Sequence, residues 1–515
     1  MTIARLEAAA GTRVAGRPPG PLPVEIAPEA LHRVERARAV VERAAAGQRP
    51  VYGINTGFGH LATVRVPTDS VRALQENLGR SHAMGVGPPL SPEEVRAVMV
   101  LRLNSLLQGH SGVRRRVVEL LAAMINAGIL PSIPAWGSVG ASGDLVPLAH
   151  LALAMMGEGE VLYQGQRIPA AAALARAGLE PLRPEAKEGL ALVNGTEMSA
   201  AIGALALGRL DRLCVAMDLI AGLTIEALRG SDEPFDRRLS EARPHPHIRT
   251  VARNLRARLD GSPRLRRPGE GPVQDAYSLR AAAVVHGAAR EVFAWAAGIV
   301  ATEMGSAVDN PLVFAEDGAI VSGANFHGQP LAVAWDACRI GVATLANISE
   351  RRVERLVNPH LSGGLPPFLS RRPGIQSGLM MAQYVAAALA AEVRQMAAPA
   401  SVHTIPTSAG QEDVVSMSAA AARWLREATE RLARIAALEL VCAAQAAEMD
   451  ETPLGDAGRA LTAWVRERVP SVAEADRSLS HAVDELAQAV MAGEPYRHVR
   501  QAAGLELAGF LDESP

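Results

Sequence analysis

The chain has 515 residues, of which 49% are hydrophobic but only 3% aromatic, and its formal net charge is −2 at pH 7. This length accommodates a large buried core, and a core made mainly of Ala, Leu and Val favours long, closely packed helices over sheets. The near-neutral charge gives no reason to expect nucleic acid or an anionic membrane as a partner.

The cysteines and the single lysine limit the kinds of cofactor and covalent chemistry that we expect. Cys214, Cys338 and Cys442 lie far apart without metal-ligand spacing, so we expect neither a disulfide framework nor a bound metal. Lys187 is the only lysine among 52 basic residues, which disfavours pyridoxal phosphate (PLP) and lysine-based aldolase chemistry. The first residues lack the apolar core of a signal peptide, and no uninterrupted apolar run is long enough to span a bilayer. We therefore expect a cytoplasmic protein.

Helical patterns dominate the chain in sequence order. Residues 1–60 are less regular and contain one predicted helix, Leu31–Ala46. A capping box with proline at the first helical position, Ser91-Pro92-Glu93-Glu94, opens an amphipathic run through Leu107. The segment Glu158–Pro169 is typical of a small hairpin. Further helical patterns cover residues 113–127, 200–230, 276–304, 328–356, 376–398, 414–449 and 455–490.

The most informative segment is Gly137–Leu145, which reads GSVGASGDL. If the Gly143 nitrogen attacks the Ala141 carbonyl and water is lost, including the Ser142 hydroxyl, the tripeptide becomes a methylidene-imidazolone ring. Glycine suits this cyclisation because no side chain obstructs a close backbone approach. Pro147 is tolerated only in a first helical turn, so a helix begins directly after the tripeptide and its free N–H groups stabilise negative charge. The segment predicts an electrophile made from the backbone.

Five other segments are too polar and too rich in glycine for their apolar surroundings. They are Tyr52–Gly59 (YGINTGFG), Asn194-Gly195-Thr196, Gln274–Arg280 (QDAYSLR), Asn325–Gln329 (NFHGQ) and Gln411-Glu412-Asp413. Gln274, Tyr277 and Arg280 are spaced three apart, so we expect them along one helical face. Taken singly, each segment is explained as well by a surface turn, a helix cap or a solvated face.

Taken together and in this order, the segments resemble the aromatic amino-acid ammonia-lyase family, most closely its histidine-specific members. The similar text runs from Tyr52 to about Met417 and includes SHAMGVG, GSVGASGDL, DNPLVF (Asp309–Phe314) and NFHGQP. The resemblance implies a mainly α fold, a fumarase/aspartase-like long helical bundle with a smaller mixed N-terminal domain. We expect residues 1–115 to form that domain and residues 116–515 to form the bundle. The resemblance also implies a homotetramer whose active sites are assembled from several subunits.

The activity implied by the resemblance is non-oxidative elimination of ammonia from L-histidine to give urocanate. The imidazolone electrophile would bond the amine and make it a better leaving group, while Tyr52 would remove the β-proton. A phenol with a usual pKa of about 10 needs nearby positive charge and hydrogen bonds to act as a base near neutral pH. Arg280 would clamp the carboxylate. The other implied site residues are Asn194, Gln274, Tyr277 and Asn325, which position the electrophile and carboxylate, and Phe326, which walls the ring pocket.

Substrate choice is expected to depend on His82 and Glu412, which the resemblance places facing the substrate ring. A carboxylate suits an imidazole N–H, whereas a phenyl ring would leave it buried and unpaired. Three residues depart from the usual histidine pattern: Glu197 where Gln is common, His403 where Asp is common, and Val414 where His is common. Tyrosine or phenylalanine ammonia-lyase, an aromatic aminomutase and a catalytically silent homologue therefore stay open as alternatives.

Overall fold

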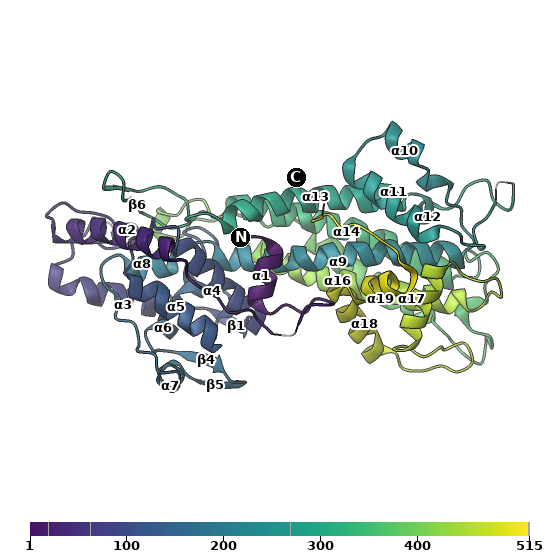
Figure 1. The fold of residues 1–515 in the computed structure, drawn as a ribbon, viewed down its shortest axis with the longest axis horizontal. Coiled ribbons are helices and arrows are strands. Elements are labelled where there is room, and N and C mark those ends of the chain that lie inside the picture. Colours follow the sequence, from purple (N-terminus) through teal and green to yellow (C-terminus); the bar gives the residue numbers. More distant parts are fainter. Residues whose placement is uncertain (19, 62, 268, 513–515) are drawn as a thin grey trace.

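Long helices that run side by side form the body of the protein. The computed structural model describes residues 1–512 except residues 19, 62 and 268. The molecule is elongated, with four helices along its length (Figure 1). These are α9 (Glu197–Ala227), α13 (Ala282–Met304), α14 (Gln329–Val357) and α16 (Ser418–Ala447). The most extensive packing joins α14 to α16 and α16 to α9. The mainly α class predicted from the sequence is confirmed.

Small residues let these helices approach closely. Helix α9 is buried over nearly its whole length, because it is apolar on almost every side. A Cβ added to Gly203 of α9 would lie 2.3 Å from the ring of Trp335 on α14, and one added to Gly341 of α14 would lie 2.8 Å from Phe293 on α13. At each of these two crossings a glycine makes room for an aromatic ring of the neighbouring helix.

Two of the long helices, α13 and α14, are long and apolar enough to cross a membrane, judged by length and composition alone. The most apolar stretch of α14 is 72% buried inside the protein, where the helix packs on α13, on α15 (Met380–Met396) and on α16. A core helix of a bundle has the same composition because its whole circumference is covered.

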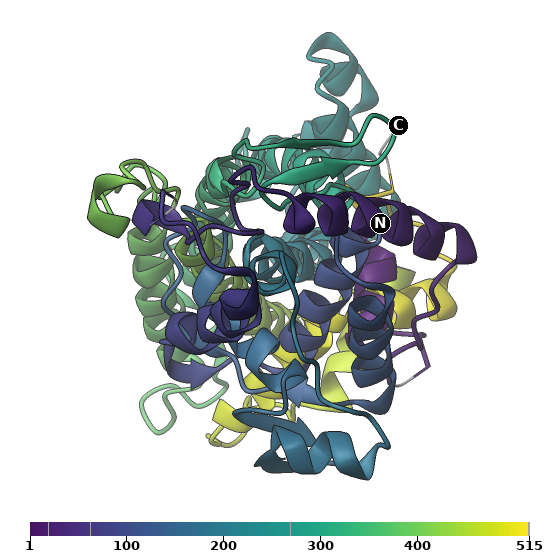
Figure 2. The same cartoon turned by 90° about the vertical axis from the view of Figure 1, so that its left-hand side faces the viewer.

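Shorter helices and the small sheets of the described residues gather at one end of the molecule (Figures 1 and 2). The helices of the N-terminal part are α1 (Ile3–Ala10), α2 (Pro28–Ala46), α3 (Val71–His82), α4 (Pro92–Leu106), α5 (Arg115–Ala127), α6 (Leu145–Met155), α7 (Ala170–Arg176) and α8 (Glu188–Val193). Strand β1 (Val86–Pro89) pairs with β3 (Pro134–Trp136), and β2 (Leu130–Pro131), β4 (Glu160–Tyr163) and β5 (Gln166–Pro169) form a second antiparallel sheet. A third pair joins β6 (Leu312–Phe314) to β7 (Ala319–Val321).

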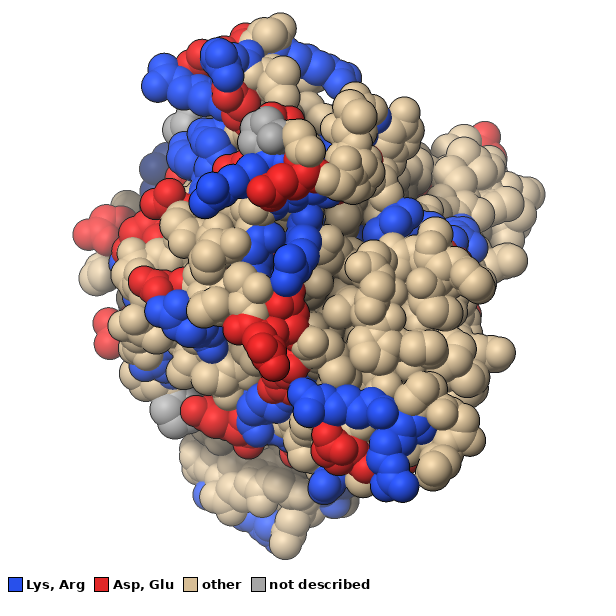
Figure 3. All heavy atoms as spheres, turned by 90° about the vertical axis from the view of Figure 1, so that its right-hand side faces the viewer, with Lys and Arg blue, Asp and Glu red and all other residues tan. Residues whose placement is uncertain are grey.

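The opposite end carries the short helices of the C-terminal half (Figure 1). They are α10 (Arg237–Ala242), α11 (Pro246–Leu259), α12 (Tyr277–Arg280), α17 (Asp456–Arg466), α18 (Ser480–Ala492) and α19 (Glu494–Ala503). Single 3₁₀ turns occur at Gly59–Leu61, Thr68–Ser70, Glu233–Phe235, Pro367–Leu369 and Ser408–Gly410. On the surface of this end, charged residues crowd one side, while a broad stretch on the other side carries few of them (Figure 3).

Most local predictions are confirmed. The predicted hairpin is β4–β5, and the capping box of α4 is complete, because Glu94 N donates to Ser91 Oγ (3.3 Å) and Ser91 N donates to Glu94 Oε2 (2.9 Å). The single helix predicted for residues 455–490 is wrong. The chain leaves the helix after α17 near Pro470, which cannot donate a backbone hydrogen bond, and becomes helical again at α18. Helices α1, α3, α7, α8, α10, α11 and α19 were not predicted.

Candidate active site

A cavity of about 510 Å³ at the α2–α8 end brings together side chains that are far apart in the sequence. Its wall includes Tyr52, His82, Ser142, Asn194, Phe326 and Glu412. A second cavity, of about 520 Å³, shares Tyr52, Ser142, Phe326 and Glu412 with the first and adds Ala141. More than half of the site residues expected from the sequence therefore line these two cavities, which share part of their walls.

The Ala-Ser-Gly segment lies directly against the turn that follows α8. Gly143 has a φ of +71°, and a Cβ there would lie 2.2 Å from the carbonyl oxygen of Gly195, so only glycine fits. The same oxygen accepts a 2.6 Å hydrogen bond from Asp144 N. Asn194 Nδ2 donates to the carbonyl oxygen of Ser142 at 2.7 Å. The turn thus holds the tripeptide through its backbone.

Asp144 occupies the N-cap position of α6, so the predicted helix start is confirmed, but its carboxylate does not cap that helix. It accepts hydrogen bonds from Ser138 Oγ (2.7 Å) and from the N (2.8 Å) and Oγ (2.9 Å) of Ser199 near the start of α9. Burial raises the pKa of Asp144 even though these donors oppose the shift. Asp144 therefore ties the beginning of α6 to the beginning of α9.

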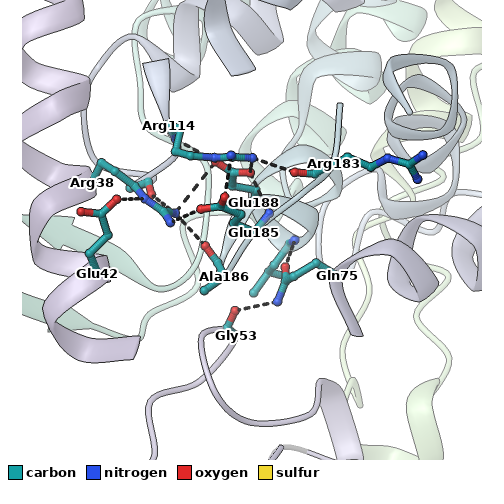
Figure 4. A network of polar contacts seen from close by, with 11 residues as sticks. Arg38, Glu42, Gly53, Gln75, Arg114, Arg183, Glu185, Ala186 and Glu188 are labelled. Atoms are coloured by element: carbon teal, nitrogen blue, oxygen red, sulfur yellow. Dashed lines mark hydrogen bonds and ion pairs between the residues drawn. The ribbon is translucent and has the colours of Figure 1, made fainter. Parts of the chain in front are cut away.

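The loop that carries Tyr52 is held by α3. Gln75 of α3 is buried, its Nε2 donates to the carbonyl oxygen of Gly53 (3.3 Å), and its Oε1 accepts from Leu190 N on α8 (3.3 Å). Gly53 has a φ of +70°, and a Cβ there would lie 2.4 Å from Leu190 Cδ2. The buried side-chain amide of Gln75 therefore connects the loop that carries Tyr52 to α8, the helix that precedes Asn194 (Figure 4).

A network of ion pairs fixes the other side of α8 (Figure 4). Glu188, the first residue of α8, is buried and accepts hydrogen bonds from Arg114 Nε (2.8 Å) and Nη2 (2.7 Å). Arg38 of α2 donates to Glu185 Oε2 and to the carbonyl oxygen of Ala186, both at 3.0 Å. Because α8 has only six residues, these contacts add to its few backbone bonds and fix the position of its first turn.

The surroundings of Tyr52 raise its pKa rather than lower it. Burial is the largest cause, and the carboxylates of Glu412 and Asp309 add to it, while the hydrogen bond from Gly59 N to Tyr52 Oη (3.2 Å) opposes them. The ring of Phe58 packs edge-on at 6.3 Å between centroids. A phenol that acts as a base near neutral pH needs positive charge beside it, and among the described residues of the single chain no cation contributes to the pKa shift of Tyr52.

Glu412 and His82 both line the first cavity. Glu412 accepts hydrogen bonds from the Ser142 hydroxyl and from Thr407 Oγ1 (2.8 Å). His82, the last residue of α3, has Nδ1 at 3.0 Å from Ser81 Oγ. Burial lowers the pKa of His82, although Glu412 opposes that shift. The cavity therefore offers one carboxylate and one imidazole to a polar ring.

Gln274, Tyr277 and Arg280 are not part of this cavity. They line a separate cavity of about 470 Å³ around α12, at the opposite end of the long axis (Figure 1). The expectation of one shared helical face is wrong, because Gln274 precedes α12. The Arg280 guanidinium lies 4.7 Å from the Tyr277 ring centroid, and Tyr277 is 72% exposed.

Asn325 is exposed, and its Nδ2 donates to the carbonyl oxygen of Ala307 (3.3 Å) rather than facing the cavity. Asn310 lines both cavities instead, and its Oδ1 accepts from Gly323 N (2.8 Å). Asn310 belongs to the DNPLVF motif but is not among the site residues expected from the sequence.

The three departures from the histidine pattern fall in different places. His403 is exposed, and Val414 is 56% exposed at the rim of the second cavity, where its carbonyl oxygen lies 3.1 Å from His327 Nε2. Glu197 is buried beside the Asn194 turn.

Other reactive groups are occupied or inaccessible. Lys187 is fully buried and its Nζ lies 2.6 Å from Asp309 Oδ2, so it is not available to form a Schiff base. Cys214, Cys338 and Cys442 are free and buried. Across residues 1–512, leaving aside the three undescribed positions, no group of three His, Cys, Asp or Glu side chains could hold a metal ion.

Comparison with known proteins agrees with the geometry. The family model described as aromatic amino acid lyase matches residues 6–467. A histidine ammonia-lyase of Geobacillus thermodenitrificans is 51% identical over 90% of this chain and 92% of the relative. Among solved structures, tyrosine aminomutase from Streptomyces globisporus superposes with a TM-score of 0.93 at 37% identity, covering 98% of both chains. Histidine ammonia-lyase from Trypanosoma cruzi superposes with a TM-score of 0.89 at 39% identity, covering 98% of this chain and 94% of that one.

Proposed function

Because the chain belongs to the aromatic amino acid lyase family, we propose that it eliminates ammonia from L-histidine to give urocanate. The observation that carries this proposal is the cavity in which Tyr52, Ser142 and Asn194 face His82 and Glu412. The first three suit an elimination, and the last two suit an imidazole ring. The proposed enzyme works in the cytoplasm.

The residues around Ala141-Ser142-Gly143 fit a methylidene-imidazolone. The ring needs an unobstructed backbone at Gly143, where a Cβ would collide with Gly195, and a carbonyl oxygen on Ser142, which Asn194 Nδ2 already holds at 2.7 Å. When formed, the ring supplies an electrophile that ordinary side chains lack. Asn194 stabilises negative charge on the Ser142 oxygen, because a fixed donor needs no reorganisation.

In the proposed mechanism Tyr52 accepts the β-proton at its phenol oxygen. In the single chain its pKa is raised by burial, Glu412 and Asp309, so a cation must be added before it can act near neutral pH. Arg280 is that cation in our proposal, and it binds the substrate carboxylate as well. Arg280 lies at the far end of its own chain, so it must reach the cavity from another subunit of a homotetramer.

A mixing experiment tests this assembly. Tyr52→Phe and Arg280→Met should each be almost inactive, because each removes one half of every site. Co-expression of the two variants should restore activity, because random assortment leaves about a quarter of the sites with both native groups. Activity should be measured with histidine after purification of the mixed assemblies. If Tyr52 and Arg280 act within one chain, the mixture stays as inactive as its parents.

The substrate itself is tested by incubating the protein with histidine, tyrosine and phenylalanine in parallel and following the ultraviolet absorbance of each unsaturated product. We expect histidine to be turned over fastest. A preference for tyrosine or phenylalanine would overturn the histidine assignment and leave the lyase assignment intact.

A second candidate is an aromatic aminomutase, which the 0.93 TM-score with a tyrosine aminomutase favours. A β-amino acid among the products, separated by chromatography, would identify it.

Specificity should depend on Glu412 and His82. Glu412→Gln weakens a charge-assisted hydrogen bond to the substrate imidazole, which is worth roughly 1.5–3 kcal/mol, so kcat/KM for histidine should fall far more than any activity on phenylalanine. His82→Leu should shift preference towards an apolar ring, because it replaces a polar partner with hydrophobic wall.

Glu412 also accepts a hydrogen bond from Ser142, so the mass of each variant must show that the electrophile has formed. If Glu412→Gln lowers the activities on histidine and phenylalanine equally, Glu412 does not discriminate between the substrate rings.

A further inference from the structure

A buried ion pair lies behind the Asn194-Gly195 turn. Arg102 of α4 and Glu197 of α9 approach to 2.8 Å, and both side chains are almost fully buried. Burying two charges commonly costs as much free energy as their attraction returns, so stability alone does not account for the pair. Arg102 Nε and Nη2 have no hydrogen-bond partner among the described residues. The guanidinium therefore makes few polar contacts, and these are with Glu197 and with the carbonyl oxygen of Asn194 in the turn.

Arg102 is connected to the reactive tripeptide through a single residue, Asn194. Its Nη1 donates to the carbonyl oxygen of Asn194 (2.9 Å), and Asn194 Nδ2 in turn donates to the carbonyl oxygen of Ser142 (2.7 Å). Movement of the guanidinium would therefore move the backbone of Asn194 and its amide donor together.

Gly195 lies between the ion pair and the tripeptide and packs against both. On one side, a Cβ at Gly195 would lie 2.2 Å from Arg102 Nη1 and 2.3 Å from Glu197 Oε2. On the other side, its carbonyl oxygen would lie 2.2 Å from a Cβ at Gly143 and accepts a 2.6 Å hydrogen bond from Asp144 N. No side chain separates the two charges from the backbone that must close into the ring.

We propose that Arg102 and Glu197 are a positioning pair, which holds the Asn194-Gly195 turn against Ala141-Ser142-Gly143 during ring closure and then keeps the Asn194 amide on the Ser142 carbonyl oxygen. The inference deepens the proposed function and rests on it. Neither residue lines the cavity, so both act through the turn.

The charge of the pair changes within the working pH range. Burial raises the pKa of Glu197 to about 7 although Arg102 opposes the shift, and the nearby carboxylates of Asp144 and Glu303 add to the rise. Glu303 faces the same turn, since it accepts a hydrogen bond from Thr196 Oγ1. Above this pH Glu197 is ionised and pairs with Arg102, and below it the guanidinium loses its counter-ion. Positioning should therefore weaken as the pH falls through about 7.

The chain offers a matched control on the same helix. Glu226, near the other end of α9, pairs with Arg258 at 2.8 Å, both side chains are fully buried, and Arg258 also has nitrogens without a hydrogen-bond partner among the described residues. This pair touches no residue of the cavity wall. Glu226→Gln and Arg258→Met thus each break a buried ion pair of the same helix without the proposed role.

The test compares Arg102→Met, Arg102→Lys and Glu197→Gln with these two controls in the full-length protein. Intact-mass spectrometry measures the fraction of chains that have lost the two waters of ring formation, and thermal unfolding measures the stability of each variant. We expect Arg102→Met to be purified mostly unmodified, and Arg102→Lys to recover part of the modified mass because the charge remains. Both controls should be fully modified despite lower stability.

Kinetics on the matured protein complete the test. Glu197→Gln should lower kcat on the order of 10-fold, as expected when a donor is slightly misplaced, with little change in KM. The wild type should lose kcat relative to Glu197→Gln as the pH falls through about 7.

The proposal is overturned if the Arg102 and Glu197 variants match controls of equal stability in modified mass, kcat and pH profile. A wild type that is fully modified but does not act on histidine would instead overturn the proposed function, because the mass measurement needs no substrate. If Arg102→Met does not fold, Arg102→Lys and Glu197→Gln decide the question.

Discussion

Ser142→Ala should leave the fold intact and remove nearly all activity. The Ser142 hydroxyl is one of the waters lost when the ring forms, so alanine can cyclise at most to a ring without the exocyclic double bond. The folded protein loses only the hydrogen bond from this hydroxyl to Glu412, which is worth about 1 kcal/mol. Intact-mass spectrometry should find the wild-type chain about two waters lighter than its sequence.

Ser111→Ala is the matched control. Ser111 is buried, its hydroxyl has no hydrogen-bond partner among the described residues, and it lies outside the cavity wall. We expect this variant to keep both the modified mass and the activity of the wild type. An active wild-type enzyme with an unmodified mass would exclude the imidazolone mechanism.

Tyr52→Phe should lower turnover on the order of 10²-fold or more, because it deletes the proposed base and keeps the ring. Phenylalanine preserves the edge-on contact with Phe58 and loses only the hydrogen bond from Gly59 N. Substrate affinity and the modified mass should therefore change little. Steady-state kinetics with histidine, together with intact mass, separate a lost base from a failure to form the electrophile.

Tyr163→Phe provides the comparison for this result. Tyr163 is a buried tyrosine of β4 that does not line either cavity. Removal of its hydroxyl in Tyr163→Phe should therefore leave kcat unchanged. Near-native turnover in Tyr52→Phe would move the base to another residue, and Tyr277 is the next candidate.

Local signals in the sequence were sufficient for much of the architecture. The Ser91–Glu94 capping box places the start of α4 because both of its hydrogen bonds form within one turn. Pro147 restricts the start of α6 to the residues just after Gly143 for a similar reason. The predicted helical pattern over residues 276–304 is divided at Ala281 into α12 and α13, although no helix-breaking residue stands there.

Contacts between segments far apart in the chain could not be predicted from the sequence. Gln75 and Asn310 were not selected as site residues, because the positions they contact, Gly53, Leu190 and Gly323, are adjacent only after folding. The carboxylate of Asp144 binds Ser199 of α9, a contact between segments that become adjacent only after folding.

The chemistry available to this protein was readable in the chain alone, since Ala141, Ser142 and Gly143 are covalent neighbours and ring closure among them needs no distant residue. The tertiary structure decided the charge states and the location of each group. A pKa depends on burial and on charges within a few ångströms, and these arise from segments far apart in sequence. The raised pKa values of Tyr52 and Glu197 and the separation of Arg280 from the cavity are therefore properties of the fold.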